Sequence, residues 1–124
     1  MTFRFEKLEV WQRAREFNRA AYDAVRHFPK SEEYALSAQL RRAAISVSSN
    51  IAEGSGRNSD ADFAHFLEIA YGSLMEVVSQ IYLAFDQSYM NESELNALLQ
   101  KADVIAGQLS ALARSLGREP RRTK

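Results

Sequence analysis

The chain contains two histidines, and each has carboxylates within about one helical turn, an arrangement that can contribute to a metal site. Asp62 precedes His65 by three residues and Glu68 follows it by three, while His27 follows Asp23 by four. A di-metal carboxylate site in a helical bundle needs a Glu on each of two helices and an E-x-x-H pair on each of the other two. The sequence has no E-x-x-H pair, so neither group supplies a full ligand set. We predict no metal centre.

Side chains for covalent catalysis are also missing. The sequence has no cysteine and no G-x-S-x-G, and the serines at 46–49 lie among alanines with no histidine nearby in the chain. No strand is predicted before the glycines of Gly54-Ser55-Gly56, so we interpret them as a helix-ending turn rather than a phosphate cradle. We therefore expect a protein that is not an enzyme, with no catalytic residues and no cofactor. The lack of cysteine fits a reducing cytoplasm.

Arginine is the residue type that most favours a binding function. Twelve of the sixteen basic residues are arginines, whose planar guanidinium binds phosphate or carboxylate through paired hydrogen bonds. A genome-wide codon bias would give the same ratio, and the arginines near residues 13–26 have Glu16 and Asp23 as local partners. The candidates for nucleic-acid binding are Arg13, Arg15, Arg19, Arg26, Arg114, Arg118, Arg121, Arg122 and Lys124.

Charge is segregated along the chain although the net charge is zero. The basic residues exceed the acidic ones in 1–57 and in 101–124, whereas 58–100 contain seven acids and no Lys or Arg. Such blocks can form one acidic and one basic face on a small protein. They can equally pair with each other inside a bundle or between subunits, and the sequence leaves both interpretations open.

Four helices must position these side chains. Apolar residues recur every three or four positions, the pattern of a bundle helix, with the strictest series near the C-terminus. The three clearest series are Val10, Ala14, Phe17, Ala21, Ala24 and Phe28; Phe63, Leu67, Ala70, Leu74, Val77, Ile81 and Ala84; and Leu95, Leu98, Ala102, Ile105, Leu109, Leu112 and Leu116. We expect an all-α, antiparallel up-down-up-down four-helix bundle over residues 1–117 and a basic, disordered tail over 118–124.

Helix ends are predicted from capping residues. The first helix should run from about Glu6 to Phe28 and end before Pro29. Ser31 is the expected N-cap of the second helix, which should end near Gly54 in a left-handed turn. Further caps are expected at Ser59 with Asp62, at Asn91 with Glu94, and at Gly117. No apolar stretch approaches the roughly 20 residues of a membrane span, so we expect a soluble cytoplasmic protein without membrane contact.

The third helix has more apolar surface than one bundle face requires. Beside its main series runs an aromatic one, and tyrosine suits interfaces because its ring is buried while its hydroxyl stays hydrogen-bonded. We predict that this stripe contacts another copy of the chain: Tyr71, Val78, Tyr82, Phe85 and Tyr89.

The second helix, SAQLRRAAISVSSNIAEGSGR from Ser37 to Arg57, combines small residues with a few polar ones. Apolar residues on more than one side predict a helix in contact with several neighbours. We assign its polar exceptions to a structural polar network: Arg41, Arg42, Asn50, Glu53 and Arg57. We predict that Asn50 and Glu53 bond to Arg42 or Arg57 in a buried polar network, and the alternative is contact with a ligand or an RNA base.

QLRRAAISVSSNIAEGSGR and the opening FEKLEVWQRAREF resemble the four-helix bundle proteins of the 23S rRNA intervening-sequence family. The resemblance extends through about Leu116; NIAEG, preceded by RRA, is its most specific part. It implies a short antiparallel bundle, often assembled as a ring of five, with a largely undefined role. Relatives that act beside retroelement reverse transcriptases bind nucleic acid and the polymerase.

Two function classes follow. In the first, a cyclic homo-oligomer, a pentamer by the resemblance, binds RNA or DNA phosphates through its arginines, which symmetry repeats around the ring. In the second, the protein is a scaffold that assembles and docks a protein partner through its aromatic stripe and acidic third helix. Nucleic-acid binding that falls with salt would distinguish the two.

Overall fold

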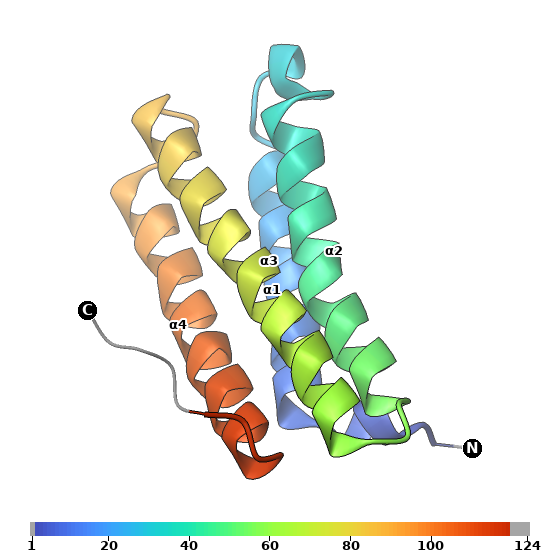
Figure 1. The fold of residues 1–124 in the computed structure, drawn as a ribbon. Coiled ribbons are helices and arrows are strands. Elements are labelled where there is room, and N and C mark those ends of the chain that lie inside the picture. The colour runs from blue at the N-terminus through green and yellow to red at the C-terminus, as the bar shows by residue number, and fades with distance from the viewer. Residues whose placement is uncertain (1, 120–124) are drawn as a thin grey trace.

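The computed structural model describes residues 2–119, and every regular element in that part of the chain is helical (Figure 1). The four long helices are α1 (Glu9–Val25), α2 (Leu36–Ser55), α3 (Asp60–Asp86) and α4 (Glu92–Ser115). Two short 3-10 helices, η1 (Arg4–Lys7) and η2 (Lys30–Glu32), precede α1 and α2. The connections α1–α2 and α3–α4 lie at one end of the molecule, and the α2–α3 connection lies at the other (Figure 1).

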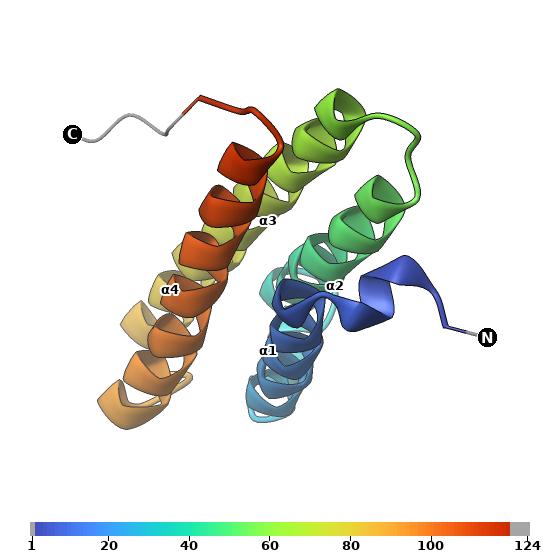
Figure 2. The ribbon, with the colours of Figure 1, turned by 90° about the horizontal axis from the view of Figure 1, so that it is seen from below.

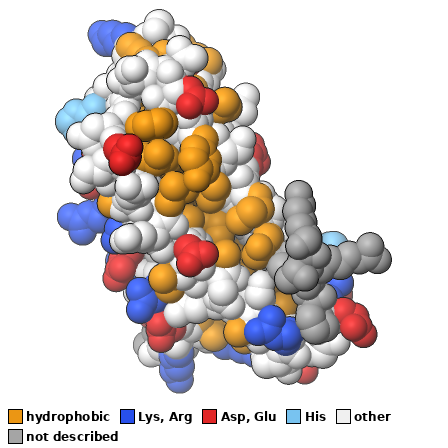
Figure 3. All heavy atoms as spheres, turned by 90° about the vertical axis from the view of Figure 1, so that its left-hand side faces the viewer, with side chains coloured by type: hydrophobic (Ala, Val, Ile, Leu, Met, Phe, Trp, Pro, Cys, Tyr) orange, Lys and Arg blue, Asp and Glu red, His pale blue; other side chains and the backbone are white. Residues whose placement is uncertain are grey.

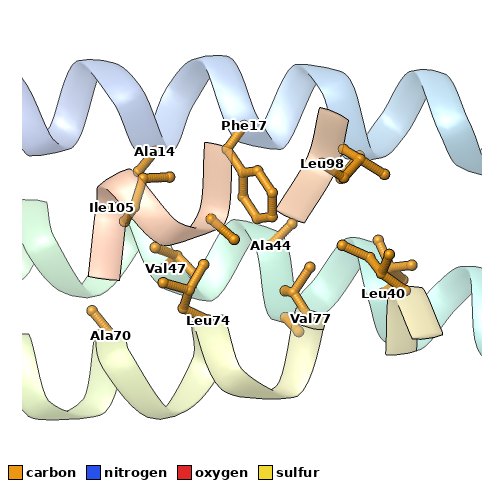
Figure 4. Close-up of a cluster of buried hydrophobic side chains, with 14 of the residues drawn as sticks. Ala14, Phe17, Leu40, Ala44, Val47, Ala70, Leu74, Val77, Leu98 and Ile105 are labelled. Atoms are coloured by element: carbon orange, nitrogen blue, oxygen red, sulfur yellow. The ribbon is translucent and has the colours of Figure 1, made fainter. Parts of the chain in front are cut away.

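The core forms where the predicted apolar series of the four helices meet. Phe17 of α1, Leu74 of α3 and Ile105 of α4 are fully buried, together with Leu40 and Val47 of α2. Figure 4 shows these series facing one another across the centre of the bundle. All seven residues predicted for the core of α3 are buried, which confirms that series.

The predicted series are wrong by one residue near two helix ends. Val25 is buried where the pattern predicts Ala24, and Ala113 is buried where it predicts Leu112. An α-helix has 3.6 residues per turn, so a strict seven-residue series drifts around the helix by about 20° every two turns. The drift accumulates toward the ends, where a neighbouring position takes over the core-facing side.

The first helix is shorter than predicted. The chain runs through η1, becomes extended at Leu8, and only then enters α1, which ends at Val25 rather than Phe28. Figure 2 shows the N-terminal segment crossing the end of the bundle instead of continuing the axis of α1. Phe5 packs edge-on against Trp11 with 4.7 Å between ring centroids, so the turn at Leu8 brings an aromatic residue back onto α1.

The predicted start of α2 is wrong as well, because Ser31 lies in η2 and α2 begins only at Leu36. A carboxylate takes the capping role: Glu32 Oε1 accepts from the Leu36 backbone N–H at 3.3 Å. Its other oxygen, Oε2, accepts from the Tyr89 hydroxyl at 2.8 Å. Glu32 thus links the α1–α2 connection to the α3–α4 connection, two segments far apart in the sequence.

The hydrogen bond to Glu32 raises the pKa of Tyr89, with burial and the negative charge of Glu32 adding to the effect. A group with a raised folded-state pKa stabilises the fold below its ordinary pKa of about 10 and loses that contribution as pH rises through the folded value. We expect Tyr89→Phe to lower the melting temperature at about pH 8. The difference in melting temperature between wild type and variant should be smaller at about pH 10.5. Melts followed by circular dichroism at both pH values test this. A difference in melting temperature that is the same at both pH values would contradict this prediction.

The other caps agree with the sequence, with one exception. Ser59 Oγ accepts from the Asp62 N–H at 3.1 Å, and Asn91 and Glu94 form a reciprocal capping box at 2.8 and 2.9 Å. Gly117, with φ +92°, ends α4 as predicted. The exception is the end of α2, which runs through Gly54 to Ser55 and has its C-cap Gly56 at φ −87°, so the predicted left-handed turn there is wrong.

Candidate functional site

A groove of about 550 Å³ lies between α3 and α4. Its apolar lining comes from both helices, with Tyr82 at 48% and Met75 at 40% exposure. Asn96, Gln100 and Asp103 of α4 add polar groups to the lining. Figure 3 shows hydrophobic side chains gathered into a patch on this side of the molecule. We call this hollow the α3–α4 groove. Its apolar lining residues are Tyr71, Met75, Val78, Tyr82, Leu99, Ala102 and Ala106.

Three of the five residues predicted for an oligomer interface line this groove: Tyr71, Val78 and Tyr82. The other two do not line it. Phe85 is half-buried and packs against the core, and Tyr89 bonds to Glu32 at the end of the bundle. The sequence pattern did not reveal the α4 half of the lining, because spacing within one helix does not say which helix lies beside it.

Three further exposed apolar residues lie on α2 and α3, outside the groove. Ile69 and Leu83 belong to the α3 series 69-73-76-80-83, and Ser73 of that series bonds to Ser46 of α2 at 2.8 Å. Ile45 of α2 lies next to Ser46 in the chain. The side chains are 42%, 40% and 51% exposed for Ile45, Ile69 and Leu83, and we call them the α2–α3 row. The protomer therefore also exposes apolar side chains on a side of α3 that does not line the groove.

The polar residues of α2 do not form a buried network within one chain. Asn50 Nδ2 donates to the Ser46 carbonyl oxygen at 2.8 Å and to Ser46 Oγ at 2.9 Å, not to an arginine. Glu53 pairs with Arg57 at 3.1 Å, and both side chains are about half exposed, at 57% and 45%. Arg42 is exposed. The predicted burial of Glu53 is wrong for the protomer, and an exposed pair of this kind stabilises a fold by about 1 kcal/mol at most.

Cation–π contacts hold two arginines at the α2–α3 end of the bundle. The Arg57 guanidinium carbon lies 4.6 Å from the centroid of Phe66, and that of Arg4 lies 5.0 Å from the centroid of Phe63. Arg4 Nη1 also donates to the Ser55 carbonyl oxygen at 3.2 Å. Local spacing gives no signal for Arg4, because its partners lie more than fifty residues away in the sequence.

The predicted arginines of α1 and its C-cap residue Arg26 are all exposed, but they differ in their partners. Arg13 Nε bonds to Glu9 Oε2 at 3.0 Å, and this bond, together with one from Gln108, lowers the pKa of Glu9. Arg26 pairs with Asp23, as the local-partner interpretation predicts. Arg15 lies 5.6 Å from the Trp11 ring centroid. Neither Arg15 nor Arg19 has a carboxylate within 4.0 Å among residues 2–119.

At the C-terminal end, Arg114 is exposed in the last turn of α4. Arg118 is half-buried, and its N–H donates to the Ala113 carbonyl oxygen at 3.1 Å. Arg121, Arg122 and Lys124, and with them most of the predicted tail, lie outside the described residues.

Residues 2–119 contain no group of three or more His, Cys, Asp or Glu placed to hold a metal ion. His27 and His65 are both exposed. Within the same residues, no helix combines the length and the hydropathy that crossing a lipid bilayer would require.

The family model of the 23S rRNA-intervening sequence protein matches residues 6–111, which include all of α1, α2 and α3 and most of α4. The chain belongs to the 23S rRNA-intervening sequence protein family. This confirms the resemblance drawn from the α2 and N-terminal segments. No curated protein sequence matches the chain.

A solved structure supports the fold of this family member. It is a protein of unknown function from the S23 ribosomal protein family of Bacteroides thetaiotaomicron. The two share 22% sequence identity, and the match covers 85% of this chain and 98% of that one with a TM-score of 0.79. At this identity the likeness establishes the shared four-helix fold and nothing further.

Proposed function

We propose that the protein is a non-enzymatic, cytoplasmic subunit of a cyclic homo-oligomer, a pentamer, that binds nucleic-acid phosphates through arginine. The observation that carries the proposal is the separation of two kinds of surface. The α3–α4 groove is open and has apolar side chains from both helices, whereas α1 and its C-cap Arg26 present four exposed arginines, two of which have no carboxylate within 4.0 Å in the described chain. One surface suits assembly and the other suits a polyanion.

The two apolar surfaces favour a ring over a symmetric dimer. In a head-to-tail interface, one surface of a protomer contacts a different surface of the next, and a ring results when the rotation closes. The α3–α4 groove and the α2–α3 row lie on different sides of α3, so each protomer can offer both surfaces at once. The short connections favour the up-down-up-down order of an antiparallel bundle, with these faces outward. The ring size of five comes from the family resemblance.

The arginine surface supports phosphate contact rather than base readout. Arg15 and Arg19 lie one turn apart on α1, so their guanidinium groups can bind successive phosphates of one strand. A ring would repeat this pair and strengthen binding through multivalency. The name of the family refers to 23S rRNA, which makes RNA the first ligand to test.

We expect single-stranded RNA to bind at about 50 mM salt and to lose at least about tenfold in affinity at about 200 mM, since neutralised phosphates release counterions. Arg15→Glu with Arg19→Glu should weaken binding at the lower salt, because it replaces two phosphate contacts with repulsion. A gel-shift titration at both salt concentrations measures these effects. Glu16→Arg with Arg19→Glu keeps the net charge of wild type on the same helix. It is the matched control, because it changes only the position of the charges.

The α3–α4 groove also supports the second candidate, a scaffold that docks a protein partner without binding nucleic acid. An open apolar surface of this kind marks an interaction site. Absence of any gel shift with DNA or RNA at about 50 mM salt, where electrostatic contacts are strongest, would favour the scaffold.

A further inference from the structure

A second hollow, of about 450 Å³, lies between the C-terminal end of α1 and the start of α2. Its floor includes Val25 and Phe28, which are 6% and 8% exposed, and Pro29 lies next to Phe28. The Tyr22 side chain lines one side, and Ser37, 3% exposed, lines another. We call this hollow the α1–α2 pocket. It lies far along α1 from Arg13 and Arg15, near the opposite end of the helix.

Three cations line the α1–α2 pocket: Arg26, Lys30 and Arg41. Arg26 is engaged by Asp23. Arg41 Nη2 donates to the Glu33 backbone carbonyl oxygen at 3.4 Å, a contact that holds the guanidinium in place and uses one of its five N–H groups. Arg41 and Lys30 have no carboxylate within 4.0 Å among residues 2–119. Two cations therefore line the pocket without a counter-charge beside them.

One carboxylate, that of Glu33, also lines the pocket. It is exposed and lies beyond 4.0 Å from both Lys30 and Arg41. A bound anion would therefore meet two unneutralised cations and one solvated carboxylate. A dianionic phosphate gains more from the cations than it loses to a single screened charge of the same sign.

The mixture of apolar floor and cations points to a particular class of ligand. A free inorganic anion needs only donors, and it would leave the floor of Val25 and Phe28 and the ring of Tyr22 unused. A nucleotide has both parts, a phosphate for arginine and lysine and a flat base that packs on aromatic and apolar side chains. The hydroxyls of Tyr22 and Ser37 can bond to the sugar or the base edge.

We propose that the α1–α2 pocket binds one nucleotide unit, with its phosphate on Lys30 and Arg41 and its base against Tyr22 and the apolar floor. As a contact with RNA, the inference rests on the proposed function and deepens it, because it adds a built site to the open arginine surface of α1. Arg41, which the sequence pattern assigns to a structural polar network, becomes a ligand-binding residue.

The test uses two probes, uridine 5′-monophosphate in equilibrium dialysis and a labelled oligouridine of about 12 nucleotides in fluorescence anisotropy. Lys30→Gln with Arg41→Gln removes two cations from the pocket. Lys7→Gln with Arg57→Gln removes the same charge from two exposed residues that do not line the pocket and is the matched control. Circular dichroism melts of all variants ensure that only folded proteins are compared.

We expect the pocket pair to weaken binding of the mononucleotide by at least about tenfold, and the control pair to change it by less than about twofold, since lost direct contacts outweigh lost long-range attraction. Tyr22→Leu should also weaken mononucleotide binding, because it removes the ring against which the base packs. Equal weakening by the two pairs would overturn the pocket, because it would show attraction to net charge alone.

The two probes separate this inference from the proposed function. If oligouridine binds and the mononucleotide does not, the pocket is wrong while the arginine surface stands. If the mononucleotide binds in the pocket and oligouridine does not, the pocket stands with a free nucleotide as its ligand, and the nucleic-acid function fails. Binding of neither probe overturns both.

Discussion

Replacing Tyr82 by glutamate should convert the assembled protein into monomers while leaving the bundle folded. Tyr82 lines the α3–α4 groove and is 48% exposed in the protomer, so the fold tolerates a charge there. In an interface, the same charge would be removed from water without a partner, at a cost of several kcal/mol. Light scattering should change from several times 14.1 kDa for wild type to 14.1 kDa for the variant, with helix content by circular dichroism unchanged.

Ser79→Glu is the matched control, because Ser79 is exposed on α3 and does not line the groove. It should leave the assembly intact. A wild-type protein that is monomeric at micromolar concentration would contradict the proposed ring, as would a Tyr82→Glu variant that still assembles.

The head-to-tail arrangement makes a further demand on the same experiment. Leu83→Glu alters the α2–α3 row and should also give monomers, whereas a symmetric dimer formed through the groove alone would survive it. The Tyr82→Glu protein retains an intact row and the Leu83→Glu protein retains an intact groove. Mixing the two should therefore produce a heterodimer, which neither variant forms alone.

The fold could be predicted because large apolar residues recur on α3 and α4 with a period that fits a helix. Phe63, Leu67 and Leu74 share one side of α3 at helical spacing, and all three are buried. Periodicity fixes the direction of a side chain around its own helix. It does not fix how far neighbouring elements cover that side, which is why Glu53 is exposed where burial was predicted.

The start of a helix could not be predicted where a hydrogen bond from a residue distant in the sequence helps to fix it. Ser31 has good local capping chemistry, yet α2 begins at Leu36 with Glu32 as its acceptor, because Glu32 is held by Tyr89 from the α3–α4 connection. The end of α3 also departs from the sequence rules. Ser88 takes the left-handed conformation at φ 65°, a role that sequence rules assign to glycine.

Only the α3 side of the α3–α4 groove could be predicted from the sequence. The aromatic surplus on α3 identified Tyr71, Val78 and Tyr82, but the groove exists only because Leu99 and Ala106 of α4 lie opposite them. The α1–α2 pocket depends even more on tertiary structure. Arg26, Lys30 and Arg41 come from the C-cap of α1, from η2 and from α2, and the turn at Pro29 brings them around one hollow.

Gly54→Ala should destabilise the protein, although alanine is the better helix former. Gly54 is buried within α2, and a Cβ added there would lie 2.6 Å from Phe66 Cβ and 3.0 Å from Phe63 Cδ1. The nearer atom is attached directly to the α3 backbone, so it cannot move away by a change of rotamer. The helices would have to separate, at a cost of about 1–3 kcal/mol, which outweighs the roughly 1 kcal/mol that alanine gains over glycine in a helix.

Gly72→Ala is the matched control, because Gly72 lies within α3 and a Cβ there would meet nothing within 4 Å. It should raise the free energy of unfolding by up to about 1 kcal/mol, measured by urea denaturation beside Gly54→Ala. A second substitution identifies the cause. If the clash is with Phe66 Cβ, adding Phe66→Ala to Gly54→Ala removes the ring but keeps the clashing atom, so the double variant should not recover stability. Recovery of stability would show that the clash is with the Phe66 ring instead. Glycine at position 54 would then not be explained by the close approach of the α2 and α3 backbones.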